Sequence, residues 1–291
     1  MNIQIEDLTK MYGTKAALNG VTVTFEENKF YGLLGKNGAG KTTLMHTIAG
    51  HILPSSGHLT IDGKHPFNNR DILKEICLIN ESSNFKKRLK VKDVLKIASL
   101  FYPNWSEETA ESLLQKFHLE RNLSTKGLSK GMESALGIII GLASRTKITI
   151  FDEPYIGLDA SARYLFYDVL LEEFQQHPRT IILSTHLIDE VSRLFEEVIA
   201  LKDGEVMMQE TAEQVIENSL QVSGKEEAVN RFVKGKRVID EKTIMGMKTA
   251  ELYGEGLSLE EAKSSGLEAE RMTLQNVIVK LTEEEEEKVY A

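Results

Sequence analysis

One glycine-rich segment holds the residues whose types and spacing are best suited to chemistry. It matches the P-loop pattern G-x-x-x-x-G-K-[ST], and its residues are Gly35, Lys36, Asn37, Gly38, Ala39, Gly40, Lys41, Thr42 and Thr43. In such a loop the glycines let backbone N–H groups curl around phosphates. We therefore predict that this segment binds a nucleotide, with Lys41 at the β- and γ-phosphates and Thr42 as a Mg²⁺ ligand.

The segments on both sides of this loop fit the strand-loop-helix setting that a P-loop requires. Residues 29–34 form a short apolar run typical of a buried strand, and residues 44–49 are typical of a helix. The helix N-terminus would add positive potential at the phosphates. A glycine-rich turn matches this pattern by chance in about one chain per hundred of this length. A chance match does not require a strand before the loop and a helix after it, and this sequence has both.

Two carboxylates follow a second apolar strand. Residues 148–151 are strand-forming and lead to Asp152, which is followed by Glu153. A carboxylate at the end of a buried strand is costly unless it is paired with a metal or with donors, so we expect Asp152 to hold Mg²⁺ through water. Glu153 lies beyond the strand tip and is expected to orient or deprotonate the water that attacks the γ-phosphate.

Two other predicted strands lead to further polar candidates. Residues 180–185 lead to His186, and residues 75–79 lead to Glu81. Polar groups at the carboxyl ends of parallel strands commonly face the ligand crevice. We expect His186 to contact the γ-phosphate, and Glu81 is a candidate for Mg²⁺ or the attacking water. Without a P-loop in the same chain, Glu81 would be interpreted as a solvated loop carboxylate.

Tyr12 and Ser129 are weaker candidates on their own. Tyr12 is expected in a loop between antiparallel strands at residues 2–8 and 21–25, either stacked on adenine or half-buried for structural reasons. The segment 128–132, Leu-Ser-Lys-Gly-Met, is expected at a helix start, where N–H groups and the Ser129 hydroxyl could meet a phosphate.

Composition limits the classes of protein to consider. The chain has 291 residues, 41% of them hydrophobic, which suits one large domain or one domain with a small appendage. Its formal net charge of −9 argues against nucleic acid as a main partner. The single cysteine, Cys77, fits the cytosol and excludes a disulfide framework. No segment is long and apolar enough to span a bilayer, so any membrane role must come from a partner.

The pattern along the chain predicts two domains. Residues 1–219 form the nucleotide-binding domain, with a helical insert at about 85–145. Residues 220–291 form a smaller α+β accessory domain in which we identify no catalytic group. Its expected core includes Val229, Phe232, Val238, Ile239, Ile244 and Leu252.

Three surface features leave alternatives open. Phe101, Tyr102 and Trp105, at a helix break, could form a binding surface, although such clusters are more often local core. The basic residues 86–88 could meet a partner or lipid headgroups, although a solvated turn is the ordinary interpretation. For the glutamates at 283–287 we expect a solvated or frayed helix.

Taken in order, these motifs resemble the nucleotide-binding subunits of ATP-binding cassette (ABC) transporters, over residues 1 to about 211. Tyr12 falls where the family stacks adenine, and Glu81 falls where its lid-loop glutamine contacts Mg²⁺ and water. Residues 128–132 align with the family signature LSGGQ. The remaining matches are Asp152 and Glu153 of the second nucleotide motif, Gly157, Leu158 and Asp159 of the D-loop, and the switch histidine His186.

The resemblance implies a fold, an activity and partners. The expected fold is α/β: a P-loop NTPase core with a RecA-like parallel sheet, an antiparallel β subdomain, the helical insert and the accessory domain. The expected function is hydrolysis of ATP with Mg²⁺ to drive export through separate integral membrane permease subunits, at the cytoplasmic face of the membrane. In this family two chains, identical or related, enclose two nucleotides, so Ser129, Gly131 and Asp159 are expected to complete the site of the opposite subunit.

The chain departs from the family pattern at four positions. Glu81 replaces a glutamine, Lys130 and Met132 replace a glycine and a glutamine of the signature, and Ala135 stands where arginine is frequent. With residues 102–105 and 273–282, these departures resemble bacterial exporters of drugs, antimicrobial peptides or cytolytic peptides. A soluble cassette ATPase acting on ribosomes or DNA would carry two P-loops, or a coiled-coil insertion and a basic surface. A regulator that binds nucleotide without turnover would lack a base such as Glu153.

Overall fold

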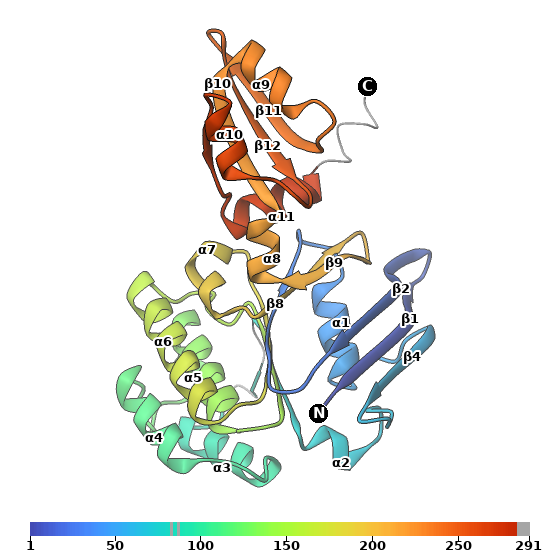
Figure 1. Ribbon diagram of the computed structural model, residues 1–291. Helices are drawn as coiled ribbons and strands as arrows, with labels where there is room; N and C mark the ends of the chain where they lie inside the picture. Colours follow the sequence, from blue (N-terminus) through green and yellow to red (C-terminus); the bar gives the residue numbers. More distant parts are fainter. Residues whose placement is uncertain (82–83, 86–87, 284–291) are drawn as a thin grey trace. The chain divides into compact units, whose positions relative to one another are not determined.

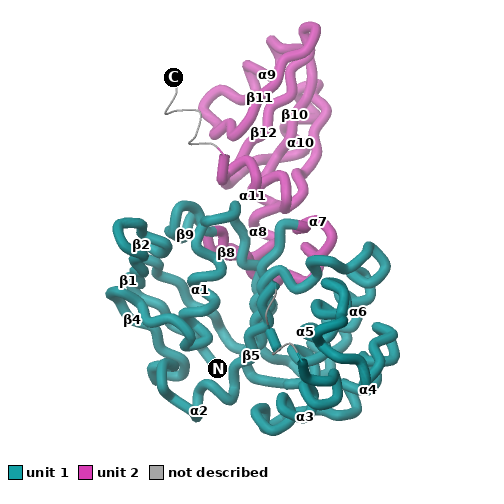
Figure 2. The backbone as a smooth tube through the Cα atoms, turned by 180° about the vertical axis from the view of Figure 1, so that it is seen from behind, with its two compact units in different colours: residues 1–186, 201–207 teal, residues 187–200, 208–291 magenta. Residues whose placement is uncertain are grey.

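The computed structural model describes residues 1–81, 84–85 and 88–283. The predictions for Lys86 and Lys87 and for the glutamates beyond Glu283 lie outside these residues. The chain divides into two compact units (Figure 2). The first comprises Met1–His186 and Leu201–Met207, and the second comprises Leu187–Ala200 and Met208–Ala291.

A parallel sheet carries the predicted nucleotide motifs. Its strands β3 (Phe30–Leu34), β6 (Ile148–Asp152) and β7 (Thr180–Ser184) are buried at every position, as expected for strands covered on both faces. Together with β5 (Ile76–Ile79) they pair in parallel in the order β5-β6-β7-β3. The sheet continues through β8 (Glu197–Lys202) and β9 (Glu205–Thr211), whose residues are divided between the two units. The carboxyl ends of the parallel strands meet at one edge, which brings their following residues together.

A second, antiparallel sheet of the first unit has the order β2-β1-β4, formed by β1 (Ile3–Tyr12), β2 (Lys15–Phe25) and β4 (Ser56–Ile61). The predicted antiparallel pair is confirmed, with Ile3 opposite Phe25. The prediction that Tyr12 lies in a loop is wrong, because β1 continues to Tyr12, which pairs with Lys15 at the end of a tight hairpin. Tyr12 is nevertheless exposed.

Helices cover one side of the first unit (Figure 1). The predicted helical insert contains α3 (Val91–Phe101), α4 (Glu107–Lys116) and α5 (Lys130–Ala143), and α6 (Ala160–Gln176) follows later in the chain. Helix α5 packs closely on β6, because a side chain added at Gly141 would lie 2.5 Å from the Phe151 ring. The interpretation of the aromatic cluster as local core is wrong for Phe101, which is 70% exposed.

Shorter helices complete the two units. Helix α1 (Lys41–Ile48) follows the P-loop as predicted, and α2 (Arg70–Leu73) precedes β5. In the second unit, the helix expected from residue 187 is the four-residue α7 (Ile188–Val191). No helix in residues 1–81, 84–85 and 88–283 is long and apolar enough to cross a membrane.

The C-terminal part of the second unit is an antiparallel sheet with helices. Sheet order is β11-β12-β10-β13, formed by β10 (Ser219–Lys225), β11 (Val238–Ile244), β12 (Met247–Tyr253) and β13 (Glu268–Glu270). Its helices are α8 (Ala212–Glu217), α9 (Glu226–Val233), α10 (Leu259–Ser264) and α11 (Leu274–Glu283).

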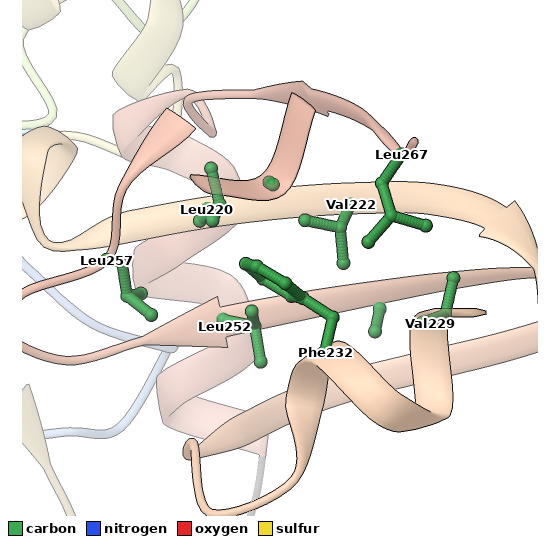
Figure 3. Packing of buried hydrophobic residues seen from close by; sticks show 9 residues of the cluster. Leu220, Val222, Val229, Phe232, Leu252, Leu257 and Leu267 are labelled. Carbon is green, nitrogen blue, oxygen red and sulfur yellow. The ribbon is translucent and has the colours of Figure 1, made fainter. Parts of the chain in front are cut away.

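The apolar cluster of this part is shown in Figure 3. It contains the predicted core residues Val229, Phe232 and Leu252, together with Leu220, Val222, Ala250, Leu257, Ala262 and Leu267. The core prediction is wrong for Ile244, which is exposed because it stands at the tip of the β11-β12 hairpin.

Helix α11 is tied to α7 within the second unit. Asp189 accepts hydrogen bonds from the Gln275 backbone N–H and from the Thr273 hydroxyl, both at 3.3 Å. The Asp189 N–H donates in return to Gln275 Oε1 at 3.5 Å. The segment that follows His186 is therefore hydrogen-bonded to the last described helix of the chain.

Candidate functional site

Glycines fix the path of the P-loop between β3 and α1. Gly35 and Gly40 have φ values of +142° and +104°, which side chains rarely adopt. A Cβ at Gly35 would lie 2.3 Å from the Leu201 carbonyl oxygen, and one at Gly40 would lie 2.5 Å from that of Ala17. At Gly38 a Cβ would meet nothing within 4 Å. The loop is thus packed against the protein at its ends and open at Gly38, where a ligand can approach the backbone.

A cavity of about 350 Å³ opens beside this loop, within the size range of small-molecule sites. It brings together many of the predicted residues, and its lining consists of Tyr12, Lys15, Ala17, Asn37, Gly38, Gly40, Lys41, Thr42, Thr43, Glu81, Asp152 and Glu153. The predicted residues Gly35, Lys36, Ala39, Ser129, Gly131, Asp159 and His186 are not part of this lining.

Lys41 is the buried cation of the cavity wall and is only 8% exposed. Its ammonium donates to the carbonyl oxygens of Gly35 at 2.6 Å and Lys36 at 3.1 Å. Burial lowers the pKa of Lys41, and the carboxylates of Glu153 and Asp152 oppose this by raising it. A buried ammonium at the N-terminus of α1 is suited to offset the charge of a phosphate.

Asp152 and Thr42 form the oxygen cluster expected of a magnesium site. The Thr42 hydroxyl donates to Asp152 Oδ2 at 2.8 Å, and the Ser184 hydroxyl donates to Oδ1 at 2.6 Å. Hydroxyl and carboxylate oxygens suit Mg²⁺, which usually takes one or two carboxylates and completes its shell with phosphates and waters. One hydroxyl and one carboxylate leave the rest of the shell to phosphate and water, so the Thr42–Asp152 donor set fits Mg²⁺ brought with a phosphate ligand.

Glu153 and His186 are in contact at the adjoining strand ends. His186 Nδ1 lies 2.8 Å from Glu153 Oε2, and the histidine side chain is 61% exposed. Glu153 has a φ of +48°, a left-handed conformation that turns the chain sharply after β6. The two residues expected to act on the γ-phosphate and on water are thereby joined.

Sequence reasoning missed a third member of this group, Tyr155. Its hydroxyl donates to Glu153 Oε2 and lies 2.8 Å from Thr185 Oγ1 and 3.2 Å from His186 Nδ1. Burial raises the pKa of Tyr155, and the Glu153 carboxylate raises it further. The only signal in the sequence is an aromatic residue after Pro154, and that position alone does not reveal where the hydroxyl points.

Ser129, Gly131 and Asp159 lie outside the cavity lining and have local structural roles. The Ser129 hydroxyl caps α5 by accepting from the Met132 N–H at 3.2 Å, and Asp159 caps α6 by accepting from the Ala162 N–H at 2.8 Å. Gly131 packs against the chain at Gly157, where a Cβ on Gly131 would lie 2.5 Å from the Gly157 carbonyl oxygen. A nucleotide contact by these residues stays a prediction.

Two departures from the family pattern meet each other. Lys130 Nζ lies 3.1 Å from Glu81 Oε1, and the side chains are 55% and 50% exposed. Glu81 also lines the cavity. The unusual acidic residue and the unusual basic residue therefore form one ion pair at the edge of the site.

A P-loop, a hydroxyl–carboxylate pair and a glutamate–histidine pair at one end of a parallel sheet define the class of P-loop nucleotide hydrolases. Comparison with known proteins narrows the class. The family model described as "ABC transporter" matches residues 18–156. The lantibiotic transport ATP-binding protein SrtF of Streptococcus pyogenes is 32% identical over 209 residues, which are 71% of this chain and 90% of that protein. The bacitracin transport ATP-binding protein BcrA of Bacillus licheniformis is 31% identical over 210 residues, which are 70% of this chain and 68% of that protein.

A solved structure agrees with these relatives. The dimeric post-hydrolysis state of the ATP-binding cassette MJ0796, bound to ADP and Pi, has a TM-score of 0.64 at 25% identity and covers 72% of this chain and 98% of that chain. The chain belongs to the ABC transporter family as an ATP-binding subunit. The α/β P-loop fold, the ATPase activity and the transport function implied by the resemblance are confirmed.

Proposed function

We propose that this ATPase binds Mg²⁺–ATP in the P-loop cavity and uses Glu153 to activate the attacking water. The observation that carries the proposal is the convergence of Lys41, the Thr42–Asp152 pair and the Glu153–His186 pair at one edge of the parallel sheet. Tyr12, exposed and on the wall of the same cavity, is positioned to stack on the adenine.

Each residue has a distinct part in the proposed hydrolysis. Lys41 offsets charge on the β- and γ-phosphates, while His186 supports Glu153 and faces the γ-phosphate. Thr42 and Asp152 would hold Mg²⁺, with Glu81 as a further oxygen donor from the cavity wall. The metal supplies positive charge that stabilises the transferring phosphoryl group.

We propose that two chains enclose two nucleotides, as an identical or a related pair. Ser129, Gly131 and Asp159 do not line the cavity of their own chain, and Ser129 is exposed at the start of α5. The Ser129 hydroxyl accepts from the Met132 N–H, and its proton can be donated to a phosphate held by the partner at the N-terminus of the 14-residue α5. The MJ0796 cassette, solved as a dimer bound to ADP and Pi, supports this arrangement.

An apolar groove of about 460 Å³ on the helical insert is the proposed docking site for the membrane permease. It is lined by Asn84, Phe85, Leu89, Val94, Ile97, Ala98, Phe101, Tyr102 and Ile140. Phe101 is 70% exposed and Ile97 is 43% exposed, which is costly without a partner. The names of the lantibiotic and bacitracin transport relatives support a peptide or antibiotic as cargo. Export of this cargo from the cytoplasmic face of the membrane is the direction that the family resemblance implies.

The dimer is tested with Glu153→Gln, which keeps the shape of the side chain and removes its basicity. This variant should bind ATP, hydrolyse it slowly and form an ATP-dependent dimer in light scattering. Adding Ser129→Arg should break the dimer without abolishing ATP binding, because a bulky cation would fill the space of the phosphate contact. A Glu153→Gln chain that stays monomeric with saturating ATP, alone and with its permease, would contradict the two-chain site.

The docking groove is tested with Phe101→Ser and a matched control. Leu100 is 79% exposed on the same helix but does not line the groove, so Leu100→Ser removes a similar apolar surface elsewhere. Phe101→Ser should lose copurification with the coexpressed permease, while Leu100→Ser keeps it. Equal copurification of the two variants with the permease would exclude the groove as the docking site.

A further inference from the structure

Tyr155 is a buried polar residue that none of the assigned roles explains. It is 2% exposed and lies just after the sharp turn at Glu153. Its hydroxyl is within hydrogen-bond reach of groups from two strand ends: Glu153 Oε2 after β6, and Thr185 Oγ1 and the His186 backbone N–H after β7. One hydroxyl therefore joins the two segments that carry the proposed base and the switch histidine.

Counting protons assigns the direction of these hydrogen bonds. A tyrosine hydroxyl has one proton, and an ionised carboxylate can only accept. The proton of Tyr155 is therefore donated to Glu153 Oε2, and burial next to that carboxylate raises the pKa of Tyr155, which keeps the proton on the tyrosine. The lone pairs of the hydroxyl accept from the His186 N–H at 3.1 Å and from the Thr185 hydroxyl at 2.8 Å.

The other partner of Glu153 engages the same carboxylate oxygen. His186 Nδ1 lies 2.8 Å from Oε2, so Oε2 faces both Tyr155 and His186. No hydrogen bond from another side chain of the described residues reaches Oε1, the second oxygen. This pattern fixes the rotation of the carboxylate and leaves one oxygen to meet a water.

We propose that Tyr155 is a positioning residue that holds the Glu153 carboxylate with one oxygen directed at the attacking water. The inference rests on the proposed role of Glu153 as the base. Tyr155 itself touches neither the nucleotide phosphates nor the water. It acts by restricting the side chain of Glu153, and Thr185 restricts Tyr155 in turn.

The direct test removes the hydroxyl with Tyr155→Phe. The expected result is a fall in kcat of about 10- to 100-fold with KM and ATP affinity unchanged, because a misdirected catalytic group lowers the rate of the chemical step and leaves binding intact. Tyr31→Phe is the matched control: Tyr31 is also fully buried, and its hydroxyl accepts from the Glu26 N–H at 2.6 Å in a different part of the first unit. The control should keep its kcat.

A purely structural hydroxyl would give a different result. In that case Tyr155→Phe would lower the melting temperature and leave kcat of the folded protein unchanged, which would overturn the proposal. A double variant that combines Tyr155→Phe with Glu153→Gln further distinguishes a positioning role of Tyr155 from a purely structural one. If Tyr155 acts through Glu153, adding Tyr155→Phe to Glu153→Gln should change the residual rate by less than about 2-fold. If Tyr155→Phe instead lowers the residual rate of the Glu153→Gln protein by the same factor as in the wild type, the proposal is also overturned.

A second variant decides the matter if Tyr155→Phe does not fold. Thr185→Val keeps the shape of the side chain and removes the hydroxyl 2.8 Å from Tyr155, and we expect a several-fold fall in kcat at unchanged KM. An unchanged kcat would contradict the proposal. Failure of the underlying function looks different: a Glu153→Gln protein with the wild-type rate would remove Glu153 as the base, whereas slow Glu153→Gln with fast Tyr155→Phe would refute the role of Tyr155 alone.

Discussion

The ion pair between Lys130 and Glu81 makes a quantitative prediction about magnesium. If Glu81 donates an oxygen to Mg²⁺, it must give up part of its interaction with Lys130 when the metal binds. Lys130→Met removes that competitor and keeps a long side chain. We therefore expect the Mg²⁺ concentration for half-maximal ATPase activity to fall in this variant.

The structure sets the size of the effect. The two side chains are 3.1 Å apart but 55% and 50% exposed, so water and salt screen their attraction. Exposed pairs of this kind contribute about 0.2–1 kcal/mol, which corresponds to about a 1.4- to 5-fold lower Mg²⁺ midpoint. The shift should shrink at high ionic strength, because screening weakens the pair that the substitution removes.

The assay is a Mg²⁺ titration of steady-state ATPase activity, with each variant normalised to its own maximum. Lys126→Met serves as the control, because Lys126 carries the same charge just before the signature and is not paired with Glu81. In a Glu81→Gln background, whose own midpoint should be higher, Lys130→Met should have no further effect. An unchanged or raised midpoint for Lys130→Met at low salt, or an equal shift in the Glu81→Gln background, would refute the reasoning.

Three further outcomes follow from the contacts. Lys41→Ala should weaken ATP binding by about 10- to 150-fold in calorimetry, because charge-assisted hydrogen bonds contribute about 1.5–3 kcal/mol; wild-type affinity in a folded variant would contradict the P-loop assignment. Gly141→Ala should destabilise the protein to urea by up to about 2 kcal/mol, since a Cβ 2.5 Å from Phe151 overpacks α5 on β6 by more than the helix gains, whereas Gly127→Ala, with nothing within 4 Å, should stay within about 0.5 kcal/mol. Asp189→Ala should cost about 1 kcal/mol by removing its bonds to Gln275 and Thr273, seen as a lower melting temperature with unchanged ATP affinity.

Much of the site could be predicted because its motifs are contiguous in sequence. The conformation of the P-loop, Gly35 to Thr43, follows from its local sequence. The apolar strands before Asp152 and His186 place both residues at one edge of the parallel sheet. Periodicity also located the helical insert. In these segments the local pattern and the tertiary environment favour the same conformation.

The rest depended on contacts between distant segments or on the end of a pairing register. The sequence predicts a loop at Tyr12 because it does not show how far the pairing of β1 with β2 extends toward the turn. It predicts a core position for Ile244 because strand alternation does not show which part of a hairpin extends beyond the helices that cover it. The Glu81–Lys130 pair joins residues that no local pattern relates. The contacts of the Tyr155 hydroxyl require the ends of β6 and β7 to be side by side.

The close contact between Gly131 and Gly157 has a consequence for the coupling of hydrolysis at two ATP sites. Gly157 stands in the turn that begins at Glu153, and the Ser134 hydroxyl of α5 also donates to the Ile156 carbonyl oxygen in this turn at 2.6 Å. No side chain separates the two backbones, so a displacement of the turn would also move the signature segment. In the proposed two-chain arrangement that segment contacts the nucleotide of the opposite site. Hydrolysis at one site would therefore change the contacts of the nucleotide at the other. The pair should then show cooperative rather than independent turnover, and a side chain wedged at Gly131 should uncouple the sites.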